Sequence, residues 1–334
     1  MSKCAIVILN WNGVQFLKEF LPVAIQNTSS NSEIIIADNA STDGSIEFLE
    51  NEFPNTRVIK LDKNYGFTGG YNRSLSQVEA EYYILLNSDV EVTLNWDVPL
   101  LDVLDSRPDV GAVMPKMLSY YNHHEFEYAG AAGGFIDKYG YPFCRGRVFH
   151  TLEHDNGQYD GEHEVFWATG ACIAVRSKLY HQLGGLDDIL FAHMEEIDFC
   201  WKLHHLNYKV IATSKSIVYH LGGGTLPKYS PIKSFLNFRN NLIVLYKNLP
   251  KSMFLNIYLH RIILDLIAAF YFLANLNFSG FYIVFKAHIV FNKFRINKII
   301  NRIENPTPNP ALVNRNTVFL YFLKGKKNYN EIIN

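Results

Sequence analysis

Short apolar runs alternate with amphipathic stretches along the first hundred residues of the chain. The stretches VQFLKEFLPVAIQN and GSIEFLENEF repeat their apolar residues at helical spacing. The intervening runs are short and rich in Ile, Val and Leu, so they predict strands at residues 4–9, 33–38, 57–61 and 82–87. Strands that alternate with helices in this way predict βαβ units, and therefore a parallel sheet covered by helices.

The pattern changes in the second half of the chain. Strands are predicted at 111–117 and at 164–175, on either side of a Gly-rich aromatic stretch at 133–147. We expect this half to add antiparallel strands to the same sheet. A helix is predicted at about 195–206, and a break in the chain at the glycines 222–224.

The last hundred residues are predicted to be mainly helical. Helices are expected at 231–248, 252–276 and 279–303. A Pro- and Asn-rich run and a short tail follow them.

Polar residues follow three of the predicted parallel strands at their carboxyl ends. Asn10 follows the first strand, Asp38 ends the second, and Asn87-Ser88-Asp89 ends the fourth. Ligands of open parallel sheets bind at these strand ends. We therefore expect these side chains to converge on one crevice.

The charge of the chain is divided unevenly. The chain has 334 residues and a formal net charge of -1, but residues 247–334 hold 12 Lys and Arg against three Asp and Glu, which gives +9. The remaining residues therefore carry -10. An acidic body with a basic end predicts that the end meets an anionic surface, although a solvated basic face is the alternative.

The cysteines and the N-terminus indicate a cytoplasmic protein. Cys4, Cys144, Cys172 and Cys200 are far apart with no CxxC pair, so we expect reduced thiols and neither a zinc ribbon nor a dithiol redox site. The apolar run before Asn10 is too short to predict a signal peptide.

Six motifs carry candidate chemistry, and their order is informative. They read IIIADNASTDGS, NYGFTGGYN, LLNSDVEV, WATGA, HMEEIDFCWK and VYHLGGG. Together they make the chain resemble the family 2 glycosyltransferases, over roughly residues 3–245, and its rhamnosyltransferase-like members in particular. The resemblance implies an inverting enzyme with the GT-A fold, a Rossmann-like mixed α/β sheet flanked by helices. To this the chain adds a C-terminal helical appendage.

The resemblance implies a nucleotide-diphosphate sugar as donor, linked to UDP or dTDP. Asp38 matches the aspartate that accepts hydrogen bonds from the base, a role that suits a carboxylate because the imide N–H is a donor. Asn64, Gly66, Gly70 and Asn72 match an asparagine and glycine loop that lets backbone approach the nucleotide. The remaining predicted donor-binding residues are Asn10, Asn87 and Ser88.

The resemblance also implies a divalent cation. Asp89 matches the last aspartate of the family's DxD motif, and Asn87 replaces the first one. His220 matches the histidine that completes the metal site in many GT-A enzymes. Oxygen ligands suit Mg²⁺ or Mn²⁺, and the imidazole favours Mn²⁺.

The general base implied by the resemblance is one of two adjacent glutamates. Inverting transfer needs a group that takes the proton of the acceptor hydroxyl. Glu195-Glu196 matches the family's acidic pair, and Glu196 takes the position of the usual aspartate, so we favour it over Glu195. A solvated acidic helix start is the structural alternative. Trp167, Thr169 and Gly170 match the region that lines the sugar and acceptor pocket, although a core role for Trp167 remains open.

The C-terminal region mixes apolar and basic residues. Residues 254–278 are very apolar, but Arg261 and Asp265 interrupt them, so a transmembrane span is not favoured. Aromatic residues interleaved with cations in 281–302 predict helices that lie on an anionic membrane. Packing on the catalytic domain, or across a homodimer, is the alternative. A nucleic-acid partner is not expected.

We therefore expect a glycosyltransferase of cell-surface polysaccharide synthesis, which acts on a glycan or lipid-linked acceptor at the cytoplasmic face of the membrane. Residues 1–245 would form the catalytic domain, with a donor half at about 1–110 and an acceptor half at about 111–245. Residues 246–334 would form the appendage. A nucleotidyltransferase and a catalytically degenerate scaffold are the alternatives. The first would need a basic Gly-rich loop that NWNGVQFLKEF lacks, and the second does not explain the retained acidic residues.

Overall fold

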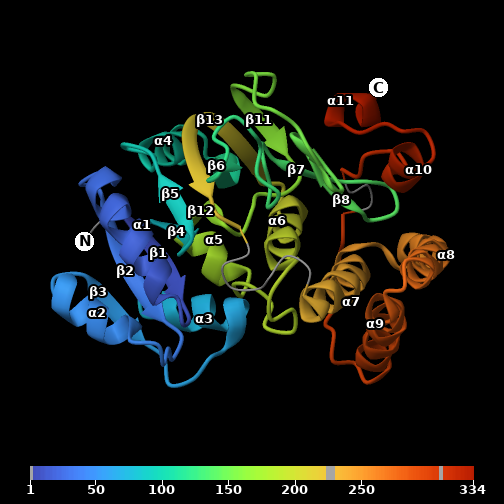
Figure 1. The fold of residues 1–334 in the computed structure, drawn as a ribbon, viewed down its shortest axis with the longest axis horizontal. Coiled ribbons are helices and arrows are strands. Elements are labelled where there is room, and N and C mark those ends of the chain that lie inside the picture. The colour runs from blue at the N-terminus through green and yellow to red at the C-terminus, as the bar shows by residue number, and fades with distance from the viewer. Residues whose placement is uncertain (1–2, 223–229, 308–310) are drawn as a thin grey trace.

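The computed structural model describes residues 3–222, 230–307 and 311–334. Among these residues, nine strands form one mixed sheet in the order β11-β13-β6-β12-β4-β1-β2-β3, with β5 paired to β13. Figure 1 shows the N-terminal strands at one end of the molecule and helices α7, α8 and α9 gathered at the other.

The N-terminal half is built from parallel strands, as the sequence predicts. Strand β1 pairs in parallel with β2 and β4, and β3 extends the sheet beyond β2. Alternate residues of β1 enter the two core clusters on opposite faces of the sheet, so both faces are buried and the strands are apolar throughout. The elements of this half are β1 (Cys4–Asn10), α1 (Val14–Asn27), β2 (Ser32–Asp38), α2 (Ser45–Glu52), β3 (Arg57–Lys60), α3 (Gly66–Leu75), β4 (Tyr82–Asn87), β5 (Val90–Val92) and α4 (Val98–Ser106).

The second half adds strands of both directions. Strand β12 is antiparallel to β4 and β6, as expected, whereas β13 runs parallel to β6, a pairing that the sequence analysis did not predict. The elements are β6 (Val110–Ser119), β11 (Glu162–Val165), β12 (Cys172–Arg176), α5 (Ser177–Gln182), α6 (Glu195–His205) and β13 (Lys209–His220). Helix α6 confirms the predicted helix at 195–206.

The single strand predicted at 164–175 is two strands. Val165 ends β11, which pairs with β13, and Cys172 begins β12, which pairs with β4. The chain leaves the sheet between them because the backbone of Trp167 exchanges hydrogen bonds with Gly134. The WATGA motif is therefore a loop.

The Gly-rich aromatic stretch forms a separate small sheet in the order β10-β9-β8-β7. Its strands are β7 (Gly134–Ile136), β8 (Pro142–Cys144), β9 (Arg147–Val148) and β10 (Thr151–Leu152). Within the described part of the chain all four cysteines are buried and unpaired.

The three predicted C-terminal helices are present as α7 (Pro231–Asn248), α8 (Lys251–Ala274) and α9 (Phe278–Ile296). The last ends earlier than predicted, because Asn297 and Lys298 leave the helix and Lys298 is left-handed. A buried network joins this bundle to the rest of the protein. Arg261 and Asp265 of α8 pair with each other, and Tyr141 donates a 3.0 Å hydrogen bond to Asp265 Oδ1.

The chain then returns to the small sheet. The short tail contains two helices, α10 (Thr317–Phe322) and α11 (Tyr329–Ile333), which the sequence analysis did not predict. The backbone N–H and hydroxyl of Thr317 both donate to Asp137 Oδ2, at 2.9 and 2.7 Å. Tyr321 and Ile332 pack against Phe143 and Val148 of the sheet.

The predicted boundary between residues 245 and 246 falls inside α7. Lys247 and Asn248, at the end of this helix, both reach Asp198 of α6. Helix α7 therefore bridges the two parts, and the division into a body and an appendage stays a prediction. Of the predicted break at 222–224, residues 223 and 224 lie outside the described part of the chain.

Candidate active site

The polar ends of the first two strands meet, as predicted. The sheet register sets Asn10 opposite Asp38. Asp38 Oδ2 accepts a 3.0 Å hydrogen bond from Asn10 Nδ2, and Asp38 Oδ1 accepts one of 2.9 Å from the backbone of Ser41. Asp38 is 2% exposed, whereas Asn10 Oδ1 is buried and has no hydrogen-bond partner among the described residues. The free hydrogen-bond acceptor at this edge of the sheet is therefore the amide oxygen of Asn10, which lies beside the Asp38 carboxylate that the sequence analysis selected.

The predicted asparagine and glycine loop is the start of a helix. Gly66 begins α3 at φ +71°, and a Cβ there would lie 2.5 Å from the ring of Phe191. A Cβ on Gly70 would lie 2.8 Å from the side chain of Leu9. Both glycines let α3 approach its protein neighbours, and their contact with a nucleotide stays a prediction. Asn64 Oδ1 accepts from the backbone of Gly66, so it shapes the start of the helix.

Asn39, which the sequence analysis did not select, completes that helix start. Its Nδ2 donates to Asn64 Oδ1 at 3.0 Å and to the carbonyl of Gly66 at 2.9 Å, and its Oδ1 accepts from the backbone of Tyr65. It follows Asp38 directly and is 2% exposed. No local signal distinguishes it from a turn asparagine, because its partners lie 25 residues or more away.

Asn72 has a positioning role in place of the predicted contact with the donor. Its Nδ2 donates to the carbonyl of Leu186 and to Asp188 Oδ1, while its Oδ1 accepts from Tyr180 and from the backbone of Leu186. An asparagine amide offers two donors and two acceptor sites, and all are used. The residue therefore ties α3 to the segment that precedes α6.

Asp89 and His220 come together at the far end of β4. His220 Nε2 lies 3.2 Å from Asp89 Oδ1, because β5 pairs Val90 directly with His220. Glu127, missed by the sequence analysis, places its Oε2 3.1 Å from His220 Nδ1. His220 is 5% exposed, and burial alone would lower its pKa, but Glu127 and Asp89 overcome this and raise the pKa to about 10. The imidazolium in turn lowers the pKa of Glu127.

The Asp89–His220 pair fits part of a metal site. Adjacent ligand atoms on an octahedral ion bound at about 2.1 Å lie about 3 Å apart, close to the observed 3.2 Å. Within residues 3–222, 230–307 and 311–334, no group of three or more His, Cys, Asp or Glu side chains is arranged to hold an ion. A cation here would take its other ligands from a diphosphate and water, the usual arrangement for Mg²⁺. Binding would also require His220 to lose its proton.

Glu195 and Glu196 form the first turn of α6, where the sequence predicts the base. Each has one carboxylate oxygen that is buried and lacks a hydrogen-bond partner in the described chain. Burial raises the pKa of Glu196 to about 7, and burial together with the charge of Glu196 raises the pKa of Glu195 well above its ordinary value. A carboxyl group with a pKa like that of Glu196 takes and releases protons near neutral pH. The alternative of a solvated helix start is therefore wrong.

The Glu pair is joined to the Asp89–His220 pair through Gly170. A Cβ on Gly170 would lie 3.5 Å from Glu195 Oε1 and 3.6 Å from Glu196 Cβ. The next residue, Ala171, accepts a hydrogen bond from the backbone of Asn87 at the end of β4. Asn87 and Ser88 are half-buried in the turn that leads to Asp89. The ends of β1, β2 and β4 and the start of α6 thus converge as expected.

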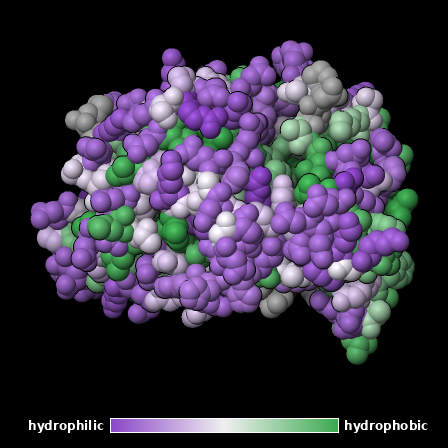
Figure 2. Space-filling view, turned by 90° about the horizontal axis from the view of Figure 1, so that it is seen from above, coloured by the Kyte–Doolittle hydropathy of each residue, from purple (hydrophilic) through white to green (hydrophobic). Residues whose placement is uncertain are grey.

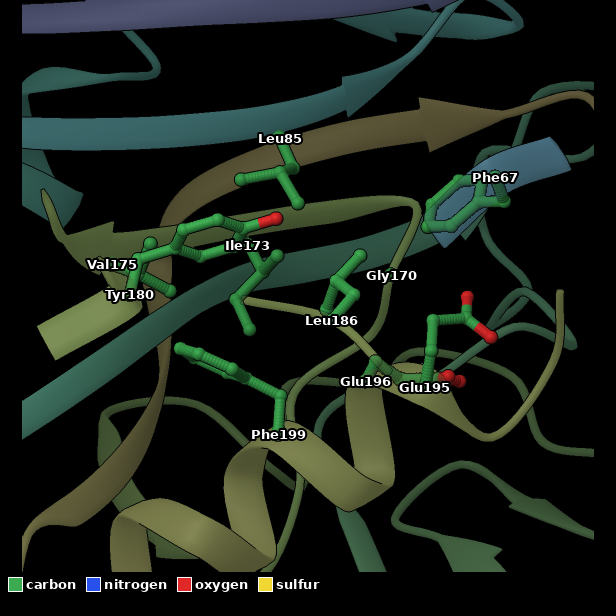
Figure 3. A pocket seen from close by; sticks show the side chains of 10 residues that line it. All are labelled: Phe67, Leu85, Gly170, Ile173, Val175, Tyr180, Leu186, Glu195, Glu196 and Phe199. Carbon is green, nitrogen blue, oxygen red and sulfur yellow. The ribbon is translucent and has the colours of Figure 1, made fainter. Parts of the chain in front are cut away.

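The cavity beside the Glu pair is small. Figure 3 shows both glutamates and Phe67 at one end of it and Tyr180 and Val175 at the other. Its volume is about 10 Å³, room for one water molecule, and most of its lining is apolar. It explains the low-dielectric setting of the carboxyl groups but does not hold a sugar.

Trp167 and Thr169 are core residues. Trp167 is 4% exposed, donates through Nε1 to the carbonyl of Phe135, and covers Gly134 so closely that a Cβ there would lie 1.9 Å from the indole. No free face is left to stack on a sugar ring, so the alternative of a core Trp holds. Thr169 is 1% exposed, and its hydroxyl accepts from the backbone of Ala171.

The backbone that leads into α6 is strained. Phe191, His193 and Met194 all have φ near +70°, a region that costs residues with side chains about 1–2 kcal/mol each. Asn240 of α7 compensates this by donating to the carbonyls of Leu190, Ala192 and His193, at 2.9, 2.8 and 2.7 Å. The neighbouring Arg239 donates to the carbonyls of Ile189 and Leu190.

The same segment also contacts α3. The carbonyl of Phe191 accepts hydrogen bonds from the backbone of Phe67 and Thr68. Residues 186–194 therefore connect three helices, and α7 holds the segment in the conformation that sets the Glu pair. Sequence analysis could not identify Arg239 and Asn240, because their role depends on partners some 50 residues away.

The chain is similar to known glycosyltransferases. The model of the family described as Glycosyl transferase family 2 matches residues 5–184. An N-acetylglucosaminyl-diphospho-decaprenol L-rhamnosyltransferase of Mycobacterium tuberculosis is 25% identical over 66% of this chain and 76% of its own length. A low-salt glycan biosynthesis hexosyltransferase, Agl10 of Haloferax volcanii, is 22% identical over 76% of this chain and 78% of its own.

Solved structures share the fold at low sequence identity. GalNAc-T7, in complex with UDP, GalNAc and Mn²⁺, superposes with a TM-score of 0.57 at 15% identity, covering 75% of this chain and about half (49%) of the GalNAc-T7 chain. Residues 1–349 of S. aureus TarS, in complex with UDP-GlcNAc, superpose with a TM-score of 0.53 at 15% identity, over 76% of this chain and 70% of that one.

Proposed function

The chain belongs to glycosyl transferase family 2 and has the GT-A fold, and from this premise we propose which transfer it performs. It moves one sugar, with inversion at the anomeric carbon, from a UDP- or dTDP-linked donor to a glycan or lipid-linked acceptor in cell-surface polysaccharide synthesis. The name of the M. tuberculosis relative describes a lipid diphosphate acceptor, and the TarS complex contains UDP-GlcNAc. Both support this choice of substrate classes.

The observation that carries the proposal is the junction at the end of β4. A turn with Asp89 paired to His220 lies on one side, and two carboxyl groups, each with one buried oxygen that lacks a partner in the described chain, lie on the other, linked through Gly170 and Ala171. Transfer to a hydroxyl needs both a site for the leaving diphosphate and a proton acceptor for the incoming oxygen. This junction supports the proposal because it offers a candidate for each.

In this proposal Glu196 takes the proton of the acceptor hydroxyl, and Glu195 orients the acceptor or donor sugar. Burial keeps the pKa of Glu196 at about 7, so much of it is ionised at neutral pH while it remains basic enough to accept a proton. Asp38 and Asn10 face the base of the donor. Asp89 and His220 hold Mg²⁺ or Mn²⁺, an ion that stabilises charge on the departing diphosphate.

The proposed catalytic domain covers about residues 1–245, with donor and acceptor halves at about 1–110 and 111–245. In this proposal the remaining helices bring it to the cytoplasmic face of an anionic membrane. One helix of the described chain, α8, is long and apolar enough by composition to cross a membrane, although its inner face carries the buried Arg261–Asp265 pair and is packed on the protein.

The experiment is a transfer assay with a panel of UDP- and dTDP-sugars and Mn²⁺, and it measures acceptor-dependent release of nucleoside diphosphate. We expect release by the wild type and by Asp109→Asn, a control at an exposed ion pair. Asp89→Asn and EDTA should abolish it. Unchanged turnover in EDTA would remove the metal from the mechanism, and a product that retains the anomeric configuration by NMR would refute inversion.

A further inference from the structure

The hairpin formed by α8 and α9 has a tip without charged residues. Residues 266–285 contain no Asp, Glu, Lys, Arg or His and include the end of α8, the turn and the start of α9. The large side chains at this tip are exposed to between 59% and 76%; they are Phe270, Tyr271, Leu276, Phe278 and Tyr282. A tip of this length and composition is unusual on a surface that faces water.

The second half of helix α8 departs from the usual polarity of a surface helix. Its charged residues Arg261 and Asp265 are 2% and 1% exposed and point into the protein, beside buried apolar residues of the same helix. After His260 its outward positions are apolar, and Ile263 and Ile267 are about 60% exposed. A helix in water buries its apolar stripe and exposes the polar one, so this arrangement is typical of a helix that faces an apolar medium.

Basic residues follow the uncharged tip along α9. Lys286, Lys293 and Lys298 are exposed on α9 and just beyond its end, and no acidic residue lies between 266 and 303. At 1.5 Å per helical residue, Lys286 lies about 12 Å along the helix axis from Phe278. Amphipathic segments bury their apolar face about 5–10 Å into the boundary between headgroups and acyl chains. Insertion to this depth sets Lys286 at the level of the headgroups.

The space-filling view agrees with this arrangement. Apolar residues gather along the right-hand edge in Figure 2, the end of the molecule where Figure 1 places α8 and α9, and they continue to a protruding point. The rest of the visible face is mainly hydrophilic.

We propose that the tip of the α8–α9 hairpin inserts into the acyl region of an anionic bilayer, with Lys286 at the headgroups and Lys293 and Lys298 on the water side of them, where they add attraction to the anionic surface. The inference deepens the proposed function, because it specifies how the enzyme meets its lipid-linked acceptor. The hairpin enters the membrane without crossing it, since hydrogen bonds from Tyr141 to Asp265 and from Arg261 to Asn241 hold α8 on the protein. A symmetric homodimer through the same face would instead bring these lysines together as like charges.

The depth of insertion is measured with a single fluorescent label on the full-length protein. The cysteines are all buried, so Leu276→Cys, at a position 76% exposed, can be labelled selectively with an environment-sensitive NBD dye. The matched control is Leu94→Cys, 72% exposed and outside the C-terminal helices. The vesicles contain phosphatidylcholine alone or with 30% phosphatidylglycerol.

We expect the label at position 276 to brighten severalfold, shift to the blue and be quenched by acyl-brominated lipid on anionic vesicles, while the label at 94 does not change. In the double variant Leu276→Glu/Phe278→Glu, the fraction of protein that floats with these vesicles should fall at least tenfold. Leu94→Glu/Leu323→Glu adds the same charge at equally exposed sites and should float normally.

Three outcomes would overturn the inference. Vesicle binding without acyl quenching at position 276 would mean surface adsorption only. A label that brightens with protein concentration in the absence of lipid would identify a second copy as the occupant. If the protein fails to bind vesicles but still transfers sugar to a soluble acceptor, insertion is refuted and the proposed function stands. If the hairpin inserts but the protein has no transferase activity, the proposed function is refuted and insertion stands.

Discussion

Replacement of Asn240 by alanine should release the segment before α6 from its hydrogen bonds to α7. The change removes the amide whose two N–H groups are shared among the carbonyls of Leu190, Ala192 and His193, and whose Oδ1 accepts from Arg239. At about 1 kcal/mol for each amide hydrogen and about 1 kcal/mol for the acceptor side, these contacts contribute about 3 kcal/mol. That is comparable to the cost of three left-handed residues at about 1–2 kcal/mol each. Without Asn240, the backbone before Glu195 can relax and the first turn of α6 can move.

The expected loss of stability is modest, and the expected loss of activity is larger. For a chain of this length, about 3 kcal/mol corresponds to a fall in Tm of about 4 °C, which calorimetry would detect. Misplacement of a reacting group by about 1 Å can cost on the order of a hundredfold in rate. We therefore expect kcat for sugar transfer to fall between tenfold and a hundredfold, with little change in the KM for the donor.

The pH profile separates a positioning role from a purely structural one. Burial raises the pKa of Glu196 to about 7, so a base that must be ionised makes kcat rise with pH through about 7 and level off above it. If the relaxed segment admits water, the pKa falls back toward the ordinary value of 4.5. The acid limb of the kcat profile should then shift to lower pH in Asn240→Ala.

Asn241→Ala is the matched control. Asn241 is the adjacent residue on α7, but its Nδ2 donates to the carbonyl of Gly140 and its Oδ1 accepts from Arg261. The variant should lower Tm by a similar amount and leave the acid limb in place. A wild-type kcat and an unshifted limb in Asn240→Ala, or equal shifts in the two variants, would refute the reasoning.

Other substitutions test the individual roles. Glu196→Gln should lower kcat about a hundredfold or more with donor affinity retained by calorimetry, whereas Glu195→Gln should have the smaller effect; the reverse result would move the base back one residue. Asp38→Ala should raise the KM for the donor with little change in kcat, and an unmoved KM would remove Asp38 from base binding. Asp89→Ala should abolish thermal stabilisation of the protein by Mn²⁺ with nucleotide diphosphate, and retention of that stabilisation would exclude it as a metal ligand.

Local patterns were sufficient for much of the fold. The four parallel strands and their polar ends could be predicted because a strand buried on both faces is a short apolar run, and its last residue marks the edge where ligands bind. Asn10 and Asp38 lie in register for that reason. The three long C-terminal helices were predictable from periodicity alone, and so was the start of α6 at Glu195.

Long-range contacts decided what local patterns could not predict. The sequence predicts one strand at residues 164–175, but these residues form the end of β11, which pairs with β13, and the start of β12, which pairs with β4. The two strands are separate because the hydrogen bonds of Trp167 with Gly134 take the chain out of the sheet between them. Gly66 and Gly70 resemble a ligand loop in the sequence, yet the space each leaves is filled by Phe191 and by Leu9.

The candidate site shows the same division. The carboxylates at the strand ends and at the start of α6 could be identified from the sequence, because a motif is defined by residue type and spacing. Only the tertiary structure decided that Glu127 supports His220 and that Asn240 holds the strained segment before Glu195. These partners are separated by 47 to 93 residues, and a hydrogen bond or ion pair depends on the few ångströms between two atoms and not on their distance along the chain.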